Sequence, residues 1–456
     1  MSAMPDTNRN SHHSPRLSSR IPVRKDDPPS PEELSGELLE DVFFAPLGAT
    51  LQAADITRQC PALDDLSFAS LCVLRVLESS KTGRDFIQTH GIPNFSGLTR
   101  GNYFATLSSK RRLGFMKDLA GNLRAVHLPL LRAHDDLLAS FPELEGWEVW
   151  AADGHKIEHA THDSRNAKDQ YAPVNGIYKL DIRTGWADFL ALSKPTARGL
   201  EHEIKTLKRQ DPGELRCGAG KGQSSLFVYD RAVIDFQYAY NLKQSKSIYI
   251  LTEWKDNLAP MCAIPREIDR KNPANELIIR DETLSFDNSP GQWRRITAIC
   301  PDSGKTYITL TNQMTLPPGV LSECYRLRWR IEKAFDQQEQ KLDEKKAWAK
   351  SETAKSIQAI AICIAHNLLK IFSATLKAEQ DIQDSKVIRA YHADLDRREE
   401  QAREAGRSFP KKLYLALYRP TELSLQFIRW LRSCLRRSTP YQQALRILRP
   451  LMDKYI

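Results

Sequence analysis

The sequence predicts an α/β fold, in which a mixed sheet with helical crossovers lies between an N-terminal and a C-terminal helical region. Three observations support this class. Between residues 38 and 140, apolar residues recur at three- and four-residue spacing, which is typical of amphipathic helices. From Trp147 onward, short apolar runs alternate with helical segments, and from about residue 318 the helical pattern returns. The middle of the chain therefore predicts a sheet with helices packed against it.

The middle region gives the element order β-β-β-α-β-α-β. "WEVWAAD" is a short apolar strand, and "GIYKLDIRTGWADFLALS" contains two strands joined by a tight turn at Arg183-Thr184-Gly185. A helix "RGLEHEIKTLKRQ", a strand "SSLFVYD", a helix "RAVIDFQYAYNLKQ" and a strand "KSIYILTEW" follow. Asp153 and Asp230 come at the ends of two of these strands, where the functional side chains of α/β sheets gather.

Composition and charge indicate a globular protein that binds a polyanion. Of the 456 residues, 41% are hydrophobic and 27% charged, and the net charge is 66 − 57, or +9. From Arg397 to Ile456, 14 basic residues face 5 acidic ones, and from Lys81 to Arg124 the count is 8 against 2. Two basic regions that flank a nearly neutral middle favour a polyanion held at both ends, although solvated helix faces would show the same excess.

The sequence also bears on the compartment. No run approaches the roughly 20 apolar residues of a membrane span, so we expect no membrane partner. The N-terminal residues lack the apolar segment of a secretory signal. The eight cysteines are scattered without a C-x-x-C pair, which fits buried thiols in a reducing cytoplasm.

The stretch "VWAADGHKIEHATHD" allows two interpretations. His155, Glu158 and His159 spell H-x-x-E-H, the order of an inverted zinc-protease helix. Alternatively, Asp153 at the end of an apolar run holds Mg²⁺ for phosphoryl chemistry. The histidine motif follows a strand directly, with Gly154 at its head and no long amphipathic helix after it, so its context favours the aspartate.

A second motif lies in "YRLRWRIEKAF". Tyr325, Arg328 and Glu332 occupy positions i, i+3 and i+7, within about 60° of one another on a helix. Apolar neighbours such as Trp329 and Ile331 indicate that this helix is packed. A polar row on a packed helix costs desolvation unless it meets a ligand, although an ion-paired surface face is the simpler alternative.

Three stretches together resemble a known family: "AADGH", "VYDRAVID" and "LTNQMTLPPGVLSECYRLRWRIEKAF". They are similar to the DDE transposases of bacterial insertion elements, in the group with a Tyr-Arg-Glu-Lys signature, Y-x2-R-x3-E-x6-K. The resemblance covers roughly residues 145 to 370. It implies a ribonuclease-H-like core with a β-rich insertion before the final glutamate.

The resemblance assigns Asp153, Asp230 and Glu332 as the catalytic, metal-binding triad. Carboxylate oxygens suit two Mg²⁺ or Mn²⁺ ions per active site. Tyr325 and Arg328 would hold the phosphate beside the scissile bond. Further DNA contacts are expected from Arg231 and from basic residues in the glycine- and aromatic-rich part of the N-terminal region, which could be a helix-turn-helix-like reader: Arg100, Lys110, Arg111 and Arg112.

Two positions complicate this assignment. Asp235 competes with Asp230 as the second acid, but we expect it inside the following helix and prefer Asp230 at the strand end. The signature lysine falls at residue 339, which is Glu339 here, and Lys341 would lie on roughly the opposite face of the helix.

The expected domains are a disordered leader and five folded segments. These are 1–35, the leader; 36–145, a helical DNA-binding domain; 146–253, the first part of the ribonuclease-H-like catalytic core; 254–315, the β-rich insertion; 316–375, the last part of the core; and 376–456, a basic helical region.

The resemblance implies a DNA transposase that cleaves the ends of an insertion element and transfers the 3′-hydroxyl ends to target DNA. Its partners would be double-stranded DNA, both terminal repeats and target, and a second copy of the chain as a homodimer on DNA. Its location would be the bacterial cytoplasm, with the nucleoid when it is bound to DNA. The alternatives are a catalytically inactive, transposase-derived repressor or architectural factor, and a zinc peptidase.

Overall fold

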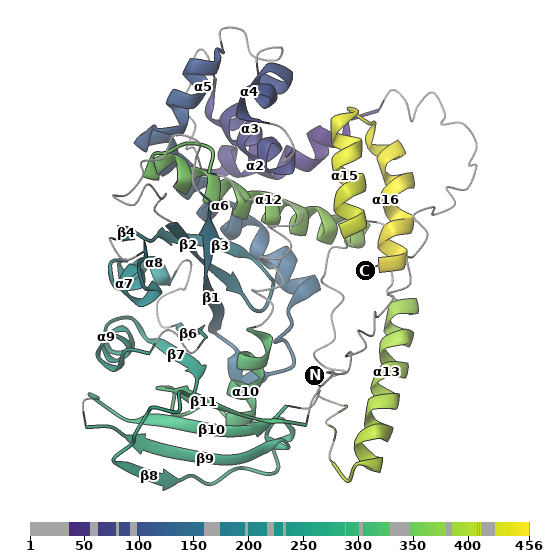
Figure 1. The fold of residues 1–456 in the computed structure, drawn as a ribbon. Helices are drawn as coiled ribbons and strands as arrows, with labels where there is room; N and C mark the ends of the chain where they lie inside the picture. Colours follow the sequence, from purple (N-terminus) through teal and green to yellow (C-terminus); the bar gives the residue numbers. More distant parts are fainter. Residues whose placement is uncertain are drawn as a thin grey trace, which may run out of the picture.

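The computed structural model describes most of the chain (Figure 1). The described residues are 36–54, 63–78, 82–91, 98–158, 174–196, 199–216, 223–230, 234–287, 289–300, 304–328, 347–379, 385–407, 409, 411 and 425–455. The fold is an α/β arrangement with helical flanks on one mixed sheet, as the sequence predicts.

The core is a nine-stranded sheet with the strand order β3-β2-β1-β6-β7-β11-β10-β9-β8. β1 pairs in parallel with β6, and β6 with β7, whereas the other neighbours are antiparallel. The strands are β1 (Trp147–Ile157), β2 (Val174–Asp181), β3 (Ala187–Leu192), β6 (Ser224–Val228), β7 (Ile248–Glu253), β8 (Cys262–Pro265), β9 (Ile278–Ser285), β10 (Trp293–Ile299) and β11 (Thr306–Thr311). A separate two-stranded sheet joins β4 (Pro195–Thr196) to β5 (Gly199–Leu200).

The predicted order of strands and crossovers is confirmed up to β7. Between β3 and β6 lie α7 (Glu203–Lys208) and α8 (Pro212–Leu215), and α9 (Phe236–Lys246) connects β6 to β7. The predicted hairpin turn joins β2 to β3, where the Gly185 amide donates to the Asp181 carbonyl at 2.7 Å and Gly185 has φ +71°. A positive φ is accessible to glycine without a steric penalty, which explains this residue in the turn.

The β-rich segment after β7 extends the same sheet. β11 pairs with β7 through Thr309↔Glu253, and β10, β9 and β8 follow outward as an antiparallel meander. Within this segment, most of β10 alternates buried and half-buried side chains, as in a sheet with one covered face. The sheet is therefore continuous from β3 to β8. In Figure 1, the strands of the meander lie at the bottom of the view.

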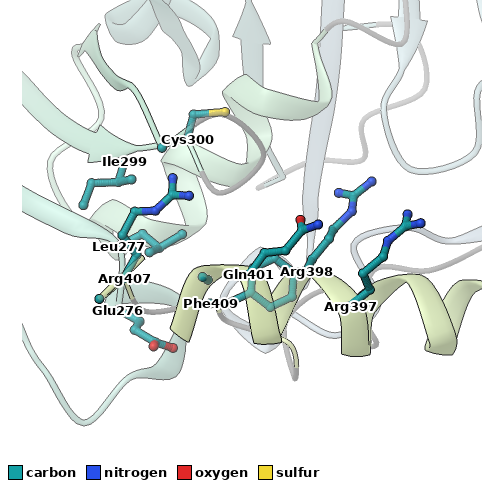
Figure 2. Close-up of a pocket in the computed structure, with 12 residues that line it drawn as sticks. Glu276, Leu277, Ile299, Cys300, Arg397, Arg398, Gln401, Arg407 and Phe409 are labelled. Carbon is teal, nitrogen blue, oxygen red and sulfur yellow. The ribbon is translucent and has the colours of Figure 1, made fainter. Parts of the chain in front are cut away.

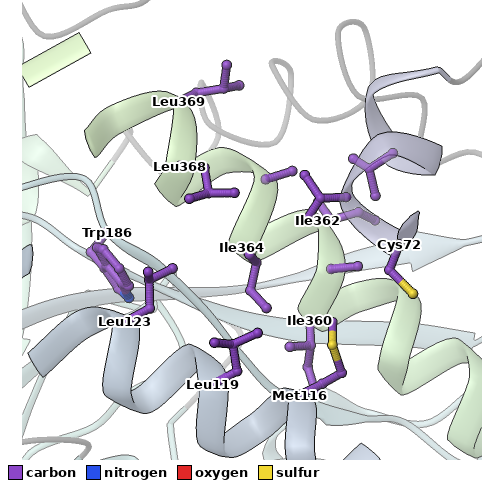
Figure 3. Packing of buried hydrophobic residues seen from close by; sticks show 14 of the residues in the cluster. Cys72, Met116, Leu119, Leu123, Trp186, Ile360, Ile362, Ile364, Leu368 and Leu369 are labelled. Carbon is purple, nitrogen blue, oxygen red and sulfur yellow. The ribbon is translucent and has the colours of Figure 1, made fainter. Parts of the chain in front are cut away.

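Helices cover the sheet on two faces. On one face, α12 (Glu352–Glu379) lies against β3 and α6 (Lys110–Asp135). Figure 3 shows Ile360 and Ile364 of α12 beside Leu119 and Leu123 of α6, with Trp186, the residue before β3, close by. On the other face, α10 (Pro318–Leu327) buries Val320, Leu321 and Cys324 against Ala151 and Val228.

α12 is long and apolar enough to span a membrane by length and composition. The expectation of no such segment is therefore wrong in its literal form. The share of its most apolar window that is buried inside the protein is 94%. A helix buried to that extent is explained as the core helix that joins the sheet to the N-terminal helices.

The N-terminal and C-terminal helices pack against each other. The N-terminal elements are α2 (Leu39–Ala54), α3 (Asp65–Leu77), α4 (Gly83–Phe86), the π-helix η1 (Ile87–Gly91), α5 (Arg100–Leu107) and α6, and the C-terminal ones are α13 (Ser385–Glu404), α15 (Leu425–Arg436) and α16 (Tyr441–Tyr455). The short 3₁₀-helices η2 (Pro142–Leu144) and η3 (Pro273–Asn275) lie before β1 and β9. The Leu39 amide donates to the Thr439 carbonyl at 3.0 Å, and Arg436 of α15 pairs with Glu78 at 2.7 Å.

Candidate active site

Two of the predicted acids lie side by side on neighbouring parallel strands. β1 and β6 pair so that Ala151 is opposite Val228. Asp153 lies two residues further along β1, and Asp230 lies two residues beyond the last residue of β6, so this register brings the two acids to the same edge of the sheet. Side chains alternate along a strand, and both half-buried carboxyl groups therefore leave the sheet on the face covered by α10.

A third acid extends this row. β6 and β7 pair with Val228 opposite Leu251, which sets Glu253 at the level of Asp230. The Thr252 hydroxyl donates to the Asp230 carbonyl at 2.6 Å and fixes the two chains at this point. We call Asp153, Asp230 and Glu253 the acid row. The sequence analysis did not single out Glu253, although it lies at the end of the apolar strand in "KSIYILTEW", as Asp230 follows the strand in "SSLFVYD".

α10 brings Tyr325 to the acid row. The Tyr325 hydroxyl donates to Glu253 Oε2 at 3.3 Å, and its ring stacks on Tyr307 with centroids 6.1 Å apart. Arg328 follows at the helix end, with its guanidinium 5.8 Å from the Tyr325 ring centroid. Burial, and then the Glu253 carboxylate, raise the pKa of Tyr325 to about 12, so the phenol stays protonated at neutral pH.

A close backbone contact fixes where α10 begins. The Gly319 amide donates to Asn275 Oδ1 at 2.8 Å. A Cβ at Gly319 would overlap the Ala274 carbonyl and lie 2.8 Å from the Asn275 nitrogen. Only glycine permits this approach of helix and η3, and the approach determines where Tyr325 meets the sheet.

A fourth acid lies at the other face of the same sheet edge. Glu203 begins α7, and its carboxyl group lies against Gly154, where a Cβ would overlap Oε1 and come 2.9 Å from Cδ. Burial, and then the charges of Asp153 and Asp230, raise the pKa of Glu203 to about 7. Sequence patterns gave no sign of this residue, because its contact with Gly154 joins segments about fifty residues apart.

A family comparison agrees with this geometry. Residues 186–368 match the transposase DDE domain. The matched segment includes Asp230, Tyr325 and Arg328 and begins after Asp153. No curated protein matches the chain. The match supports a transposase DDE domain in this part of the chain, and it agrees with the predicted α/β class.

Several predicted residues lie outside the described part of this transposase-like chain. They are Glu332, Arg231, His159, Glu339 and Lys341. Among the described residues, no three His, Cys, Asp or Glu side chains are grouped so that they alone could hold a metal ion. The metal site predicted from the resemblance therefore depends on Glu332 as well as on the two aspartates.

Asp235, the alternative to Asp230 as the second acid, has a structural role. We expected Asp235 inside the helix, but it lies just before α9 and caps it. Its carboxylate accepts a hydrogen bond from the Tyr238 amide at 2.8 Å. It also pairs with Lys208. Since these partners occupy Asp235, the geometry favours Asp230 as the acid beside Asp153.

The zinc-protease alternative does not fit the backbone. β1 runs to Ile157, so His155 lies on a strand that is paired with β2. The H-x-x-E-H motif requires one helix that carries both histidines. His155 and Glu158 are not on such a helix, so the zinc-peptidase alternative does not fit the structure.

The basic cluster at the start of α6 is only partly available to DNA. Arg112 is 2% exposed and binds Asp65 and the Leu63 carbonyl, so the predicted DNA contact does not fit Arg112. Arg111 also donates to both Asp65 oxygens, at 3.0 and 2.8 Å. Arg100 and Lys110 are exposed at the starts of α5 and α6, and their DNA contacts stay predictions.

A pocket of about 650 Å³ lies away from the predicted site residues, between the β10–β11 turn and α13 (Figure 2). Arg397, Arg398 and Arg407 line it beside Cys300. Arg397 and Arg398 both pair with Asp394 on α13, which offsets much of their charge. The pocket contains none of the residues that the resemblance assigns to catalysis.

Proposed function

We propose that this protein is a DNA transposase that cleaves the ends of an insertion element and transfers the 3′-hydroxyl ends to target DNA. One observation carries the proposal: Asp153 on β1 and Asp230 just after β6 lie at the same edge of the sheet, near the end of α10 that carries Tyr325 and Arg328. The match of residues 186–368 to the transposase DDE domain supports metal-dependent cleavage and transfer of DNA strands as the reaction at this site. The finer assignment to the Tyr-Arg-Glu-Lys group belongs to the same proposal.

The donor set fits hard divalent cations. Asp153 and Asp230 offer oxygen ligands only, and their mutual repulsion with Glu203 is the kind that Mg²⁺ or Mn²⁺ relieves. We assign Asp153, Asp230 and Glu332 as the ligands of two ions. When bound, the ions supply charge neutralisation at the phosphate and favour the deprotonated form of the attacking hydroxyl.

Other residues of the chain position the DNA. Arg328 would bind phosphate oxygens through its planar guanidinium, and Tyr325, held by Glu253, orients that end of α10. Water attacks the phosphodiester first, and the released 3′-hydroxyl then attacks the target strand. Neither step needs a covalent bond to Ser, Cys or Tyr.

The helical flanks would grip DNA outside the active site. Arg100 and Lys110 would contact the terminal repeats, and the basic C-terminal helices would contact DNA or a second subunit. Such phosphate contacts make binding weaken steeply as salt rises. We propose a homodimer that pairs two element ends, in the bacterial cytoplasm and on the nucleoid.

A cleavage assay tests the proposed activity. Wild type is incubated with Mg²⁺ or Mn²⁺ and supercoiled plasmid that carries the element ends, beside Asp153→Ala and Glu332→Ala. We expect nicked and strand-transfer products from wild type only, and none after chelation by EDTA. If wild type binds the ends without cutting them, the proposal fails in favour of an inactive, transposase-derived repressor.

A further inference from the structure

We propose that α15 and α16 form a surface that binds the phosphates of duplex DNA without regard to sequence, and that they do not form the contact between two subunits. This role rests on the proposed function and assigns the C-terminal helices to one of its two partners. We call the exposed side of the helix pair the arginine face. It consists of five exposed arginines: Arg429, Arg436, Arg437, Arg446 and Arg449.

Both helices have a basic side that points outward. On α15, Arg429 and Arg436 are seven residues apart, so they lie on one side of the helix and about 10 Å from each other along its axis. On α16, Arg446 and Arg449 are three residues apart and also share a side. Seven residues between 427 and 449 are exposed, and five of these are the arginines. The outer side of the pair therefore consists mostly of guanidinium groups.

A turn of four residues joins the two helices, which lie side by side in Figure 1. The Thr439 amide donates to the Cys434 carbonyl at 3.1 Å, and the Tyr441 amide donates to the Glu37 carbonyl at 2.7 Å. These hydrogen bonds hold the turn at both of its ends. Arg437 lies in the turn, so the arginines of both helices belong to one continuous hairpin.

The apolar side of the pair is already buried inside the protein. Phe427, Leu431 and Leu448 are 0% exposed. They belong to the same core cluster as Phe43 of α2 and Phe372 of α12, and the rings of Phe372 and Phe427 have centroids 6.5 Å apart. An amphipathic helix that binds a membrane inserts its apolar side into the lipid. Because that side is occupied here, the arginine face can meet a partner only through charge and hydrogen bonds.

The charge of the arginine face is largely uncompensated. The chain has no acidic residue from 423 to 452. Arg436 pairs with Glu78 of the N-terminal region at 2.7 Å. Three other members form no ion pair with any residue that the structure describes: Arg429, Arg437 and Arg449. Such a surface complements duplex DNA, which carries one negative charge for about every 1.7 Å of its axis.

A second copy of the chain complements this surface less well. In a twofold dimer the same patch of both copies meets, so the arginine face would oppose itself, with like charge against like charge. The buried centre of a protein interface is depleted in charged residues and enriched in aromatic ones. Within the described part of α15 and α16, no large hydrophobic side chain is exposed. Phosphate is therefore the better partner.

A structural explanation competes with this one. Arg436 and Arg437 lie at the C-terminal end of α15, where basic side chains stabilise a helix through its dipole without any ligand. The two explanations differ in a measurable quantity, the salt dependence of DNA binding. Arginines with a purely structural role would affect stability and leave that dependence unchanged.

The experiment measures binding of the full chain to duplex DNA by fluorescence anisotropy over a series of salt concentrations, without divalent cations so that no strand is cut. One duplex carries an element end, and the other has an unrelated sequence. The test variant combines Arg429→Gln, Arg437→Gln and Arg449→Gln. The matched control removes the same charge from three exposed arginines that have carboxylate partners: Arg280→Gln, Arg397→Gln and Arg403→Gln.

We expect the test variant to bind both duplexes about tenfold more weakly at about 0.1 M salt. The slope of log K against log salt should fall by about one for each arginine removed. Phosphate contacts carry no sequence information, so both duplexes should lose the same factor. The control variant should keep the affinity and slope of wild type. Circular dichroism confirms folding, and the single variant Arg429→Gln, with a slope change of about one, decides the matter if the triple variant does not fold.

Four results would overturn the inference, and they are distinguishable. If wild type binds DNA and the test variant shows the same slope, the face binds no phosphate and the proposed function stands. An equal loss in the control variant would mean that net charge alone explains the effect. A test variant that binds DNA normally but loses dimerisation in sedimentation, or loses binding to phosphatidylserine vesicles, would assign the face to a second subunit or to a membrane. If wild type binds neither duplex, the proposed function fails together with the inference.

Discussion

Asp230→Asn is expected to lower DNA cleavage by about a thousandfold or more. An amide keeps the shape of the side chain but cannot supply the negative oxygen that a divalent cation requires beside Asp153. A loss of about 4 kcal/mol of transition-state stabilisation corresponds to a factor of about a thousand. The measurement is the initial rate of plasmid nicking at saturating Mg²⁺, with DNA binding followed separately.

Asp235→Asn is the matched control for this prediction. Asn caps a helix about as well as Asp, so α9 should keep its start and cleavage should stay close to that of wild type. The lost pairing with Lys208 is partly exposed and contributes little. A large loss in Asp235→Asn with an active Asp230→Asn would show that the second acid is wrongly assigned.

Asp281→Ala is expected to lower the free energy of unfolding by about 3 to 5 kcal/mol, because it leaves a buried guanidinium without its carboxylate. Arg294 on β10 is 2% exposed and donates to the two oxygens of Asp281 on β9 at 2.8 and 2.6 Å. It also donates to the Leu316 carbonyl, just before α10, at 2.6 Å. The loss should therefore loosen both the meander and the start of α10.

Urea denaturation followed by circular dichroism measures this effect. Asp394→Ala serves as control, since it removes a carboxylate that pairs with the exposed Arg397 and Arg398 on α13. That change should cost less than about 1 kcal/mol. Equal losses in the two variants would contradict the structural role given to the buried pair.

Local patterns predict the part of the fold that depends on neighbouring residues. The alternation in "GIYKLDIRTGWADFLALS" predicts a hairpin because its turn and both strands are contiguous, and the structure confirms it. The same kind of pattern points to Asp153 and Asp230; Asp230 follows the end of β6, but β1 continues past Asp153 to Ile157, so the expected strand end at Asp153 is wrong. The meeting of the two aspartates at one edge of the sheet depends on how β1 pairs with β6 across 77 residues, which no local pattern encodes.

Long-range contacts explain the misses. Arg112 looks like a DNA contact in the sequence. In the structure it is buried in the helical region and forms an ion pair with Asp65, which lies 47 residues earlier in the chain. Glu203 looks like an ordinary acidic residue at a helix start until Gly154 brings it to the sheet edge. Glu253 carries the same signal as Asp230, an acid at the end of an apolar strand, and could have been found by the same rule.

Iron-directed backbone cleavage tests most directly whether Asp153, Asp230 and Glu332 share their cations. Fe²⁺ replaces Mg²⁺ in the full chain, ascorbate and peroxide generate radicals at the bound metal, and mass spectrometry maps the cuts. We predict cuts close to residues 153, 230 and 332, suppressed by excess Mg²⁺ and lost in Asp230→Asn. Cuts that spare any one of these three positions, or that persist unchanged in Asp230→Asn, would contradict a common metal site.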